Sequence, residues 1–463
     1  MKHSKDLSIL SVLFLCCILL VVSCKKEINE KQHNPIVTEL KSFPIKVHGH
    51  LKQTNTFSSE VVIKWLDMQN RILLQPVELN SSAEVFIPRF YSALGIALYE
   101  SVVPGMPGYQ SLYGQLINMP AMPSVVPGSA YHWAATANAT LASLYKKFLI
   151  NISAANKLAI DSLENALNAG YMVEVDALTF QRSSDYGKNV AQLIFDWSQT
   201  DGALNMYPPY VPPVGPGLWV PTPTGFSPAR GVHFGDIRTN MPGVLNQNFP
   251  PAPVPYSTNS FSAFYINMRE VYDARQSLIV SPALTAQVNY WRGTQGGSGY
   301  ILWYNILRKV LTEQGNQAML DKAALAYCKM GIVHKDAAIA LVKAKFFYNE
   351  LAPVTYIRSL LGFSTWNSFI PTPSQPTYPE IHSPQFASSA AVLSNMFGYN
   401  YSFNTNGISY LPGYSFNSFE EANQHGSISR LYSGIANRQA VNAGMWIGNK
   451  TVEYMNNHIK FLK

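Results

Sequence analysis

The hydrophobic positions of this 463-residue chain recur mostly with helical spacing. Within 138–148 the apolar residues fall at i, i+3, i+4 and i+7, and the same spacing returns over 190–197. Residues 84–103 are apolar nearly all round, which is typical of a buried helix. Strand-like alternation is scarce, so we predict a mostly α fold. Further helices are predicted at 263–276, 298–315, 318–331 and 334–351, the last broken at Ala352-Pro353.

Residues 204–262 interrupt this pattern with many prolines, as in YPPYVPPVGPG. A long helix or a central strand cannot carry them. Because Tyr207, Tyr210 and Trp219 are interspersed, we expect an ordered loop packed on the surface rather than a free linker. Later in the chain, Ser418-Phe-Glu-Glu421 fits a capping box and predicts a helix start.

The N-terminus has the layout of a secretory signal. Two lysines precede an apolar run that ends in Val-Val-Ser-Cys24, which is similar to the bacterial lipobox. We predict a signal peptide over 1–23, a lipid on Cys24 and a polar tether over 24–55. The alternative is a transmembrane anchor, for which the run is somewhat short. The expected location is the bacterial envelope, as an outer-membrane lipoprotein on the periplasmic or surface face, with the membrane reached through Cys24.

The composition is ample for a large buried core in one or two domains, and we expect one domain over 56–463. It would consist of a helical region at 56–203, the Pro-rich loop at 204–262 and a second helical region at 263–463. Hydrophobic residues make up 47% and charged residues 13%, which argues against disorder over most of the length. The formal net charge of +7 is scattered, so a nucleic-acid partner is not expected. Cys328 lies in an apolar helical pattern and is predicted to be core. No metal-binding motif is present.

Three separated stretches of the C-terminal third carry the candidate chemistry: KFFYNELAP at 345–353, PEIHSPQ at 379–385 and SRLYSGIANRQA at 429–440. In order and spacing they resemble the motifs of the vanadium-dependent haloperoxidases and the type 2 phosphatidic acid phosphatases. Those motifs are Lys-x6-Arg-Pro, Pro-Ser-Gly-His and Ser-Arg-x3-Gly-x-His-x3-Asp. The resemblance implies a helical bundle of this type, with the Pro-rich loop as an insertion.

The match to the motifs is incomplete at the catalytic and anion-binding positions. Lys345, Ser383 and Arg430 agree with the motifs. Five motif positions differ: the Arg of the first motif falls on Ala352, the Gly on Pro384, the His of the second motif on Gln385, and the His and Asp of the third motif on Ala436 and Ala440.

The family, as the resemblance implies, cradles a phosphate or vanadate oxyanion. Lys and Arg neutralise the anion, Ser and the Gly amide bond its oxygens, and one His attacks phosphorus or ligates vanadium. Alanine at 436 cannot do this, glutamine cannot transfer a proton near neutral pH, and Pro384 has no amide hydrogen. We therefore expect a catalytically degenerate member that acts by binding. The expected binding place is a residual anion pocket of Lys345, Ser383, Gln385 and Arg430, or the aromatic surface.

Other interpretations stay open. His382 precedes Gln385 by three residues and would be the acid or base of a rebuilt site, in which case the chain is a phosphatase or a haloperoxidase using vanadate. A third hypothesis is a binder of sugars or peptides through the Tyr/Trp-rich loop. The anion-binding residues also have purely structural alternatives. Lys345 would be a solvated helix residue, Ser383 a helix N-cap, and Arg430 the partner of an ion pair with Glu420 or Glu421. No cofactor is certain, and a homodimer is compatible with the sequence.

Overall fold

The computed structural model describes residues 52–75, 83–292, 299–408 and 412–463. One compact unit spans Gly49–Lys463. The expected signal peptide, Cys24 and nearly all of the expected tether lie outside the described residues. At the end of that tether the chain is already packed, because Thr54 is buried and its hydroxyl donates to the carbonyl of Val102 at 2.8 Å. Within the described ranges, no helix is long and apolar enough to cross a membrane.

The described residues are predominantly helical, which confirms the predicted fold class. Two short strands, β1 (Phe403–Asn404) and β2 (Ser415–Phe416), pair antiparallel. The helices of the first half are α1 (Glu60–Leu73), α2 (Ala83–Val102), α3 (Trp133–Phe148), α4 (Ala154–Met172) and α5 (Ala177–Gln199). The helices of the second half are α6 (Leu245–Asn248), α7 (Ala263–Val280), α8 (Pro282–Trp291), α9 (Gly299–Gln314), α10 (Leu320–Tyr348), α11 (Pro353–Ser359), α12 (Ser383–Phe397), α13 (Phe419–Tyr432) and α14 (Arg438–His458). Short 3-10 helices are η1 (Thr54–Thr56), η2 (Val103–Gly105), η3 (Val232–Asp236) and η4 (Gly315–Gln317).

Helix α10 corrects one prediction, because the two helices expected at 318–331 and 334–351 are a single helix. Ile332 and Val333 are buried and continue the apolar surface through the expected junction. The helix ends at Tyr348, before the proline at 353, because Asn349 takes a left-handed conformation with φ of 50°. Cys328 is a buried free thiol in this helix, as predicted.

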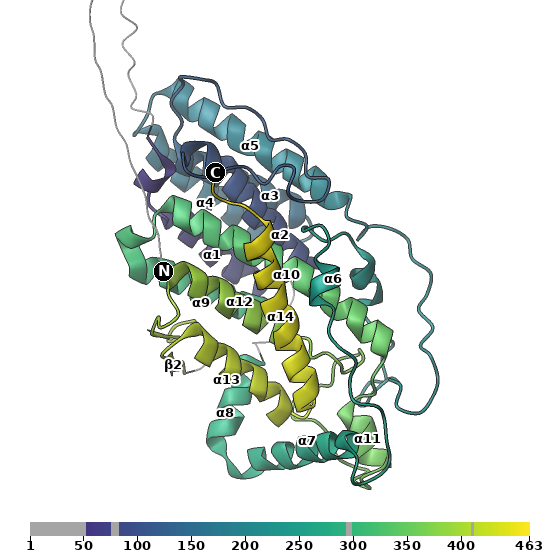
Figure 1. Ribbon diagram of the computed structural model, residues 1–463. Helices are drawn as coiled ribbons and strands as arrows, with labels where there is room; N and C mark the ends of the chain where they lie inside the picture. Colours follow the sequence, from purple (N-terminus) through teal and green to yellow (C-terminus); the bar gives the residue numbers. More distant parts are fainter. Residues whose placement is uncertain (1–51, 76–82, 293–298, 409–411) are drawn as a thin grey trace, which may run out of the picture. The chain divides into compact units, whose positions relative to one another are not determined.

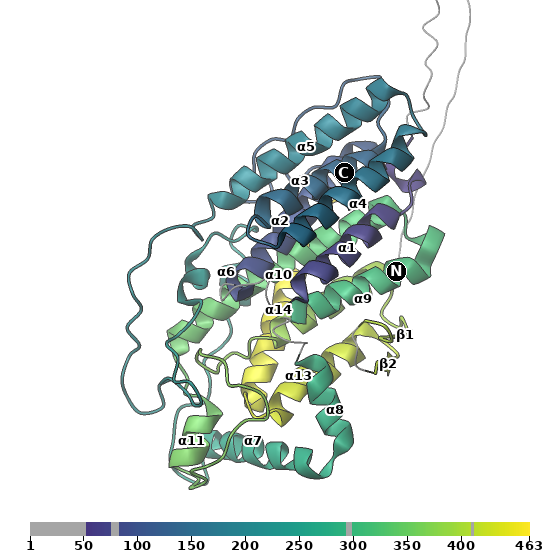
Figure 2. The ribbon, with the colours of Figure 1, turned by 180° about the vertical axis from the view of Figure 1, so that it is seen from behind.

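Helix α10 is central to the packing. It contacts α2, α12 and α14, and it passes between the N-terminal helices and the C-terminal helices in both views (Figures 1 and 2). The crossing with α2 depends on two glycines. A Cβ at Gly95 would lie 2.6 Å from the carbonyl oxygen of Tyr327, and a Cβ at Gly331 would lie 2.6 Å from that of Tyr91. Both distances are too short, so glycine is needed at each position for this helix crossing.

The Pro-rich stretch 204–262 is an irregular loop that contains only η3 and α6, in segments without proline. Parts of it are anchored in the fold. Trp219 is buried and its amide donates to the carbonyl of Asn349 at 2.8 Å. Other parts reach solvent, since the side chains of Met206 and Val214 are almost fully exposed. The loop is therefore attached beside the C-terminal end of α10.

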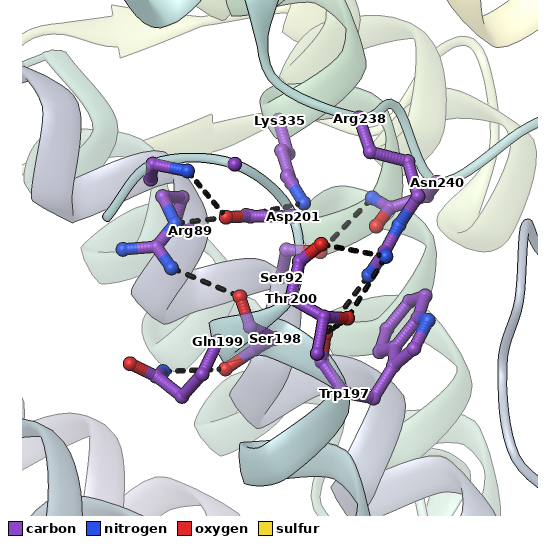
Figure 3. Close-up of polar contacts among 12 residues, drawn as sticks. Arg89, Ser92, Trp197, Ser198, Gln199, Thr200, Asp201, Arg238, Asn240 and Lys335 are labelled. Atoms are coloured by element: carbon purple, nitrogen blue, oxygen red, sulfur yellow. Dashed lines mark hydrogen bonds and ion pairs between the residues drawn. The ribbon is translucent and has the colours of Figure 1, made fainter. Parts of the chain in front are cut away.

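A buried ion network joins α2, α5 and α10 (Figure 3). The carboxylate of Asp201, just after α5, accepts from Arg89 of α2 at 2.8 Å and lies 2.9 Å from Lys335 of α10. Burial raises the pKa of Asp201, but Lys335 and Arg89 outweigh it, so its pKa is lowered overall. The carbonyl of Asp201 also accepts from the amide of Arg238, which fixes the loop that follows.

Candidate functional site

The structure brings the three motif stretches together. Lys345 lies in the last turn of α10, and Ala436 lies in the turn between α13 and α14. Both line one cavity, together with Glu380 and Ile381 from the segment that precedes α12. The cavity measures about 10 Å³, which leaves room for about one water molecule.

Lys345 is only 2% exposed, so the interpretation of a solvated helix residue is wrong. Its ammonium donates to the carbonyl oxygens of Pro376 at 2.7 Å and Thr377 at 3.3 Å. Both oxygens belong to the 372–377 loop, which therefore provides hydrogen-bond acceptors for the Lys345 ammonium group. The lysine is thus held by its own chain at the edge of the small cavity.

The N-terminus of α12 is occupied by the carboxylate of Glu380. One of its oxygens, Oε2, accepts from the amides of His382 and Ser383, each at 2.7 Å, and from the Ser383 hydroxyl at 2.8 Å. The other oxygen lies 2.8 Å from Nδ1 of His382. The predicted capping role of Ser383 is therefore wrong. Ser383 is the first helical residue and donates its hydroxyl, while Glu380 supplies the acceptor.

The charge on Glu380 is strongly stabilised. Burial raises its pKa, but the neighbouring His382, Arg430 and Ser383 outweigh burial and lower the pKa to about 2. Glu380 is 2% exposed and its amide donates to the carbonyl of Ala440 at 2.9 Å. A fixed carboxylate therefore stands where the helix amides would receive an anion.

Arg430, in the last turn of α13, is fully buried. All three of its guanidinium nitrogens lack a hydrogen-bond partner among the described residues. Its guanidinium carbon lies 5.8 Å from the ring centre of Phe386 in α12. Burial lowers the pKa of Arg430 to about 10, and the charge of Glu380 opposes that shift.

The predicted ion pair between Arg430 and Glu420 or Glu421 is wrong. Glu420 accepts from Asn423 and Gln424 on its own helix. Glu421 accepts from the amide of Asn417 at 2.6 Å, and its own amide donates to Ser418 at 3.0 Å. The predicted capping box is confirmed at Ser418, although the glutamate reaches back one residue further than the motif requires.

Gln385 and His382 lie at the same helix end with different surroundings. The Gln385 side-chain amide donates to the carbonyl of Ile381 at 3.2 Å, and its Oε1 atom is buried without a partner among the described residues. The His382 side chain is 20% exposed and faces Glu380. Three other histidines have local partners: His132 caps α3, His233 lies near Asp236, and His425 accepts from Trp291.

Two residues near this site were not singled out from the sequence. Glu380 belongs to the stretch 379–385, but its role as acceptor depends on a turn that no periodicity reveals. Glu350 is buried, and burial raises its pKa to about 8 against the effects of Asn437 and Lys345. In the sequence, such residues can be recognised as single acidic residues among apolar neighbours. No group of three or more potential metal ligands occurs within the described ranges.

The comparisons with known proteins agree with this arrangement. Residues 326–462 match the model of the VCPO second helical-bundle domain. A structure described as the first bacterial vanadium-dependent iodoperoxidase is similar over 88% of this chain and 98% of that chain, with a TM-score of 0.77 and 26% identity. The chain belongs to the vanadium haloperoxidase superfamily. A holo-type bacterial vanadium-dependent chloroperoxidase shares the fold, with 15% identity and a TM-score of 0.62 over 89% of this chain and 100% of that chain. None of the curated proteins matches in sequence.

Vanadate, the group that the superfamily name implies, does not fit this member's residues. The position of the ligating histidine is Ala436, whose methyl group lines the cavity and cannot bind a metal. Pro384 offers no amide hydrogen, and the carboxylate of Glu380 takes the amides of His382 and Ser383. The space of about 10 Å³ has room for about one water molecule and is too small to admit a vanadate ion.

Proposed function

We propose that this chain is a non-catalytic member of the vanadium haloperoxidase superfamily, held in the bacterial envelope by a lipid on Cys24, and that it acts by binding. One observation carries the proposal. At the position of the superfamily's chemistry, Ala436 and the Glu380 carboxylate line a cavity of about 10 Å³. Ala436 stands where the resemblance places the histidine that attacks phosphorus or ligates vanadium, and the cavity has room for about one water molecule.

Assays of the purified chain test the absence of catalysis. With vanadate and hydrogen peroxide, we expect no oxidation of iodide or bromide above the rate of a Lys345→Ala variant. We also expect no hydrolysis of p-nitrophenyl phosphate above that variant. Turnover that depends on Lys345 would overturn the proposal. If that turnover were also lost in His382→Ala, the result would support a rebuilt catalytic site that uses His382.

The aromatic part of the Pro-rich loop supports a binding role better than the anion site does. A hollow of about 330 Å³ is lined by Tyr207, Tyr210, His233 and Phe234, together with Pro208 and Pro209. This volume lies at the lower end of the range for small-ligand sites. The rings of Tyr207 and His233 stack with centres 4.4 Å apart. The only titratable side chains in the lining are two tyrosines and a histidine near Asp236, so a neutral ligand with apolar faces fits best.

Thermal shift with neutral probes, maltotriose for sugars and trialanine for peptides, tests this role. We expect one of them to raise the melting temperature of the wild type and not of Tyr207→Ala. Tyr399→Ala is the matched control, because Tyr399 is exposed and lies outside the lining of the hollow. No response to either probe, or an equal response in Tyr207→Ala, would contradict the role of the hollow.

A further inference from the structure

The turn between α4 and α5 carries a group of exposed apolar side chains. Met172, Val173 and Leu178 are each more than half exposed and together form an apolar tip at this turn. Each would gain free energy if its apolar surface were removed from water. Single exposed apolar residues are ordinary on a protein surface, whereas a group of them at one place indicates a contact surface.

The two acidic residues of the same turn are bound to groups of the protein itself. The carboxylate of Glu174 lies 3.1 Å from Nε2 of His132. The carboxylate of Asp176 caps α5, where it accepts from the amide of Thr179 at 2.9 Å and from the hydroxyl of Thr179 at 2.7 Å. The turn therefore holds its two carboxylates with its own donors and leaves its apolar side chains to the surroundings. This arrangement suits an apolar partner.

The described part of the chain starts beside this turn. The carbonyl of Lys52, the first described residue, accepts from Nε1 of Trp133 at 2.9 Å. The preceding residue, His132, has its ring centre 4.7 Å from that of Tyr171, which comes directly before Met172. The start of α3 thus contacts both the entry of the chain and the apolar tip. In both views, α7 and α8 lie at the opposite end of the fold from this turn (Figures 1 and 2).

The proposed lipid anchor brings a membrane to this end of the fold. Residues 25–51 join Lys52 to Cys24, the site of the proposed lipid. A tether turns a further contact with the same bilayer into an effectively intramolecular event, which favours surfaces near the point where the tether joins the fold. Apolar side chains at the boundary between lipid headgroups and acyl chains add binding in proportion to the apolar area that they bury.

We infer that the apolar tip is a second, shallow membrane contact that orients the anchored domain with this end toward the bilayer. The inference rests on the proposed function, because the lipid on Cys24 supplies the bilayer. It goes further, because a tether alone does not decide which surface meets the membrane. The orientation also bears on the proposed ligand hollow. Ala203 in its lining follows the other end of α5, a helix of 23 residues that is roughly 35 Å long.

Fluorescence quenching in vesicles tests the inference on the full lipidated chain. Three valines in different parts of the fold are about equally exposed: Val173 at 86%, Val214 in the Pro-rich loop at 96% and Val280 at the end of α7 at 81%. Val173→Cys, Val214→Cys and Val280→Cys are each labelled with monobromobimane, and Cys328 does not compete because its thiol is buried. The vesicles are phosphatidylethanolamine and phosphatidylglycerol, with brominated or plain acyl chains. Brominated lipid is expected to quench the label at position 173 and not at 214 or 280.

A second pair of variants tests whether the tip itself makes the contact. The label in Leu178→Cys also lies in the tip and should be quenched by brominated lipid. Adding Val173→Asp should reduce that quenching, because a charged group at this place opposes entry into the bilayer. Adding Val280→Asp, an equal change at the opposite end of the fold, should leave it unchanged.

The outcomes separate the inference from the proposed function. Quenching at position 214 or 280 without quenching at 173, or at none of the three, would overturn the inference while the chain still floats with the vesicles through its lipid. Quenching at 178 that Val173→Asp does not reduce would overturn it as well. A chain that does not float with vesicles and carries no acyl mass on Cys24 would overturn the proposed anchor, and the inference with it.

Discussion

The buried ion network around Asp201 gives a prediction about stability. In Asp201→Asn, Arg89 and Lys335 would remain buried with their charge uncompensated. Breaking a buried pair from one side costs about 3–5 kcal/mol. For a folded unit of roughly 400 residues the entropy of unfolding is about 0.85 kcal/mol/K, so the melting temperature should fall by about 4–6 °C.

The pH dependence of that deficit tests its electrostatic origin. The pKa of Asp201 is lowered in the folded state from its ordinary value of 3.8. The contribution of Asp201 to folding stability is therefore fully present above pH 3.8 and is lost as the pH falls through the pKa of the folded state. Thermal unfolding followed by circular dichroism should show the full deficit at pH 7 and a smaller one near pH 3. The control is Asp196→Asn, an exposed aspartate on α5, the helix that ends just before Asp201; this variant should melt like the wild type.

The reasoning would be refuted if Asp201→Asn melted within about 1 °C of the wild type at pH 7. It would also be refuted if the deficit stayed the same at pH 3. Either result would mean that packing of α2, α5 and α10 holds this region and that the charges contribute little.

Three further predictions follow from single residues. Burial raises the pKa of Glu350 to about 8, so its contribution to folding stability is fully present below the unfolded pKa of 4.5 and is lost as the pH rises through about 8. Denaturant titrations should show the stability of the wild type falling from pH 5 to 9 and a flatter profile in Glu350→Gln. An equal slope in both proteins would contradict this. Gly95→Ala should lower stability by about 1–3 kcal/mol in the same titration, because its Cβ meets a backbone oxygen of α10, whereas Gly170→Ala, with open space around it, should not. Ser418→Ala should cost about 1 kcal/mol through loss of the α13 cap, and an unchanged midpoint would show that the cap is dispensable.

The sequence predicted the helical elements well where a strong apolar pattern ran without interruption. Helix α2 was expected at 84–103 and is found at Ala83–Val102. Helix α10 was predicted as two helices, 318–331 and 334–351, whereas residues 332–333 continue one helix. Helices α2 and α12 both pack beside this junction, α2 at Gly331 and α12 at His334.

The motif spacing predicted which stretches meet, and the structure places Lys345, Glu380 and Ala436 on one cavity. What the spacing could not predict is which donor bonds which acceptor. Ser383 was expected to cap α12, but the Glu380 carboxylate is a better acceptor for those amides and takes that role. The Asp201 network was missed because its members lie far apart in the chain. Its only local signal is the polar run His334-Lys335-Asp336 within an apolar helix.

The central claim is that the superfamily's oxyanion site is closed in this chain. Equilibrium dialysis of the purified protein against orthovanadate, with bound vanadium measured by elemental analysis, tests it most directly. The account predicts no vanadium above the level of an Arg430→Met variant. Retention of about one vanadium per chain in the wild type, lost in Arg430→Met, would contradict it.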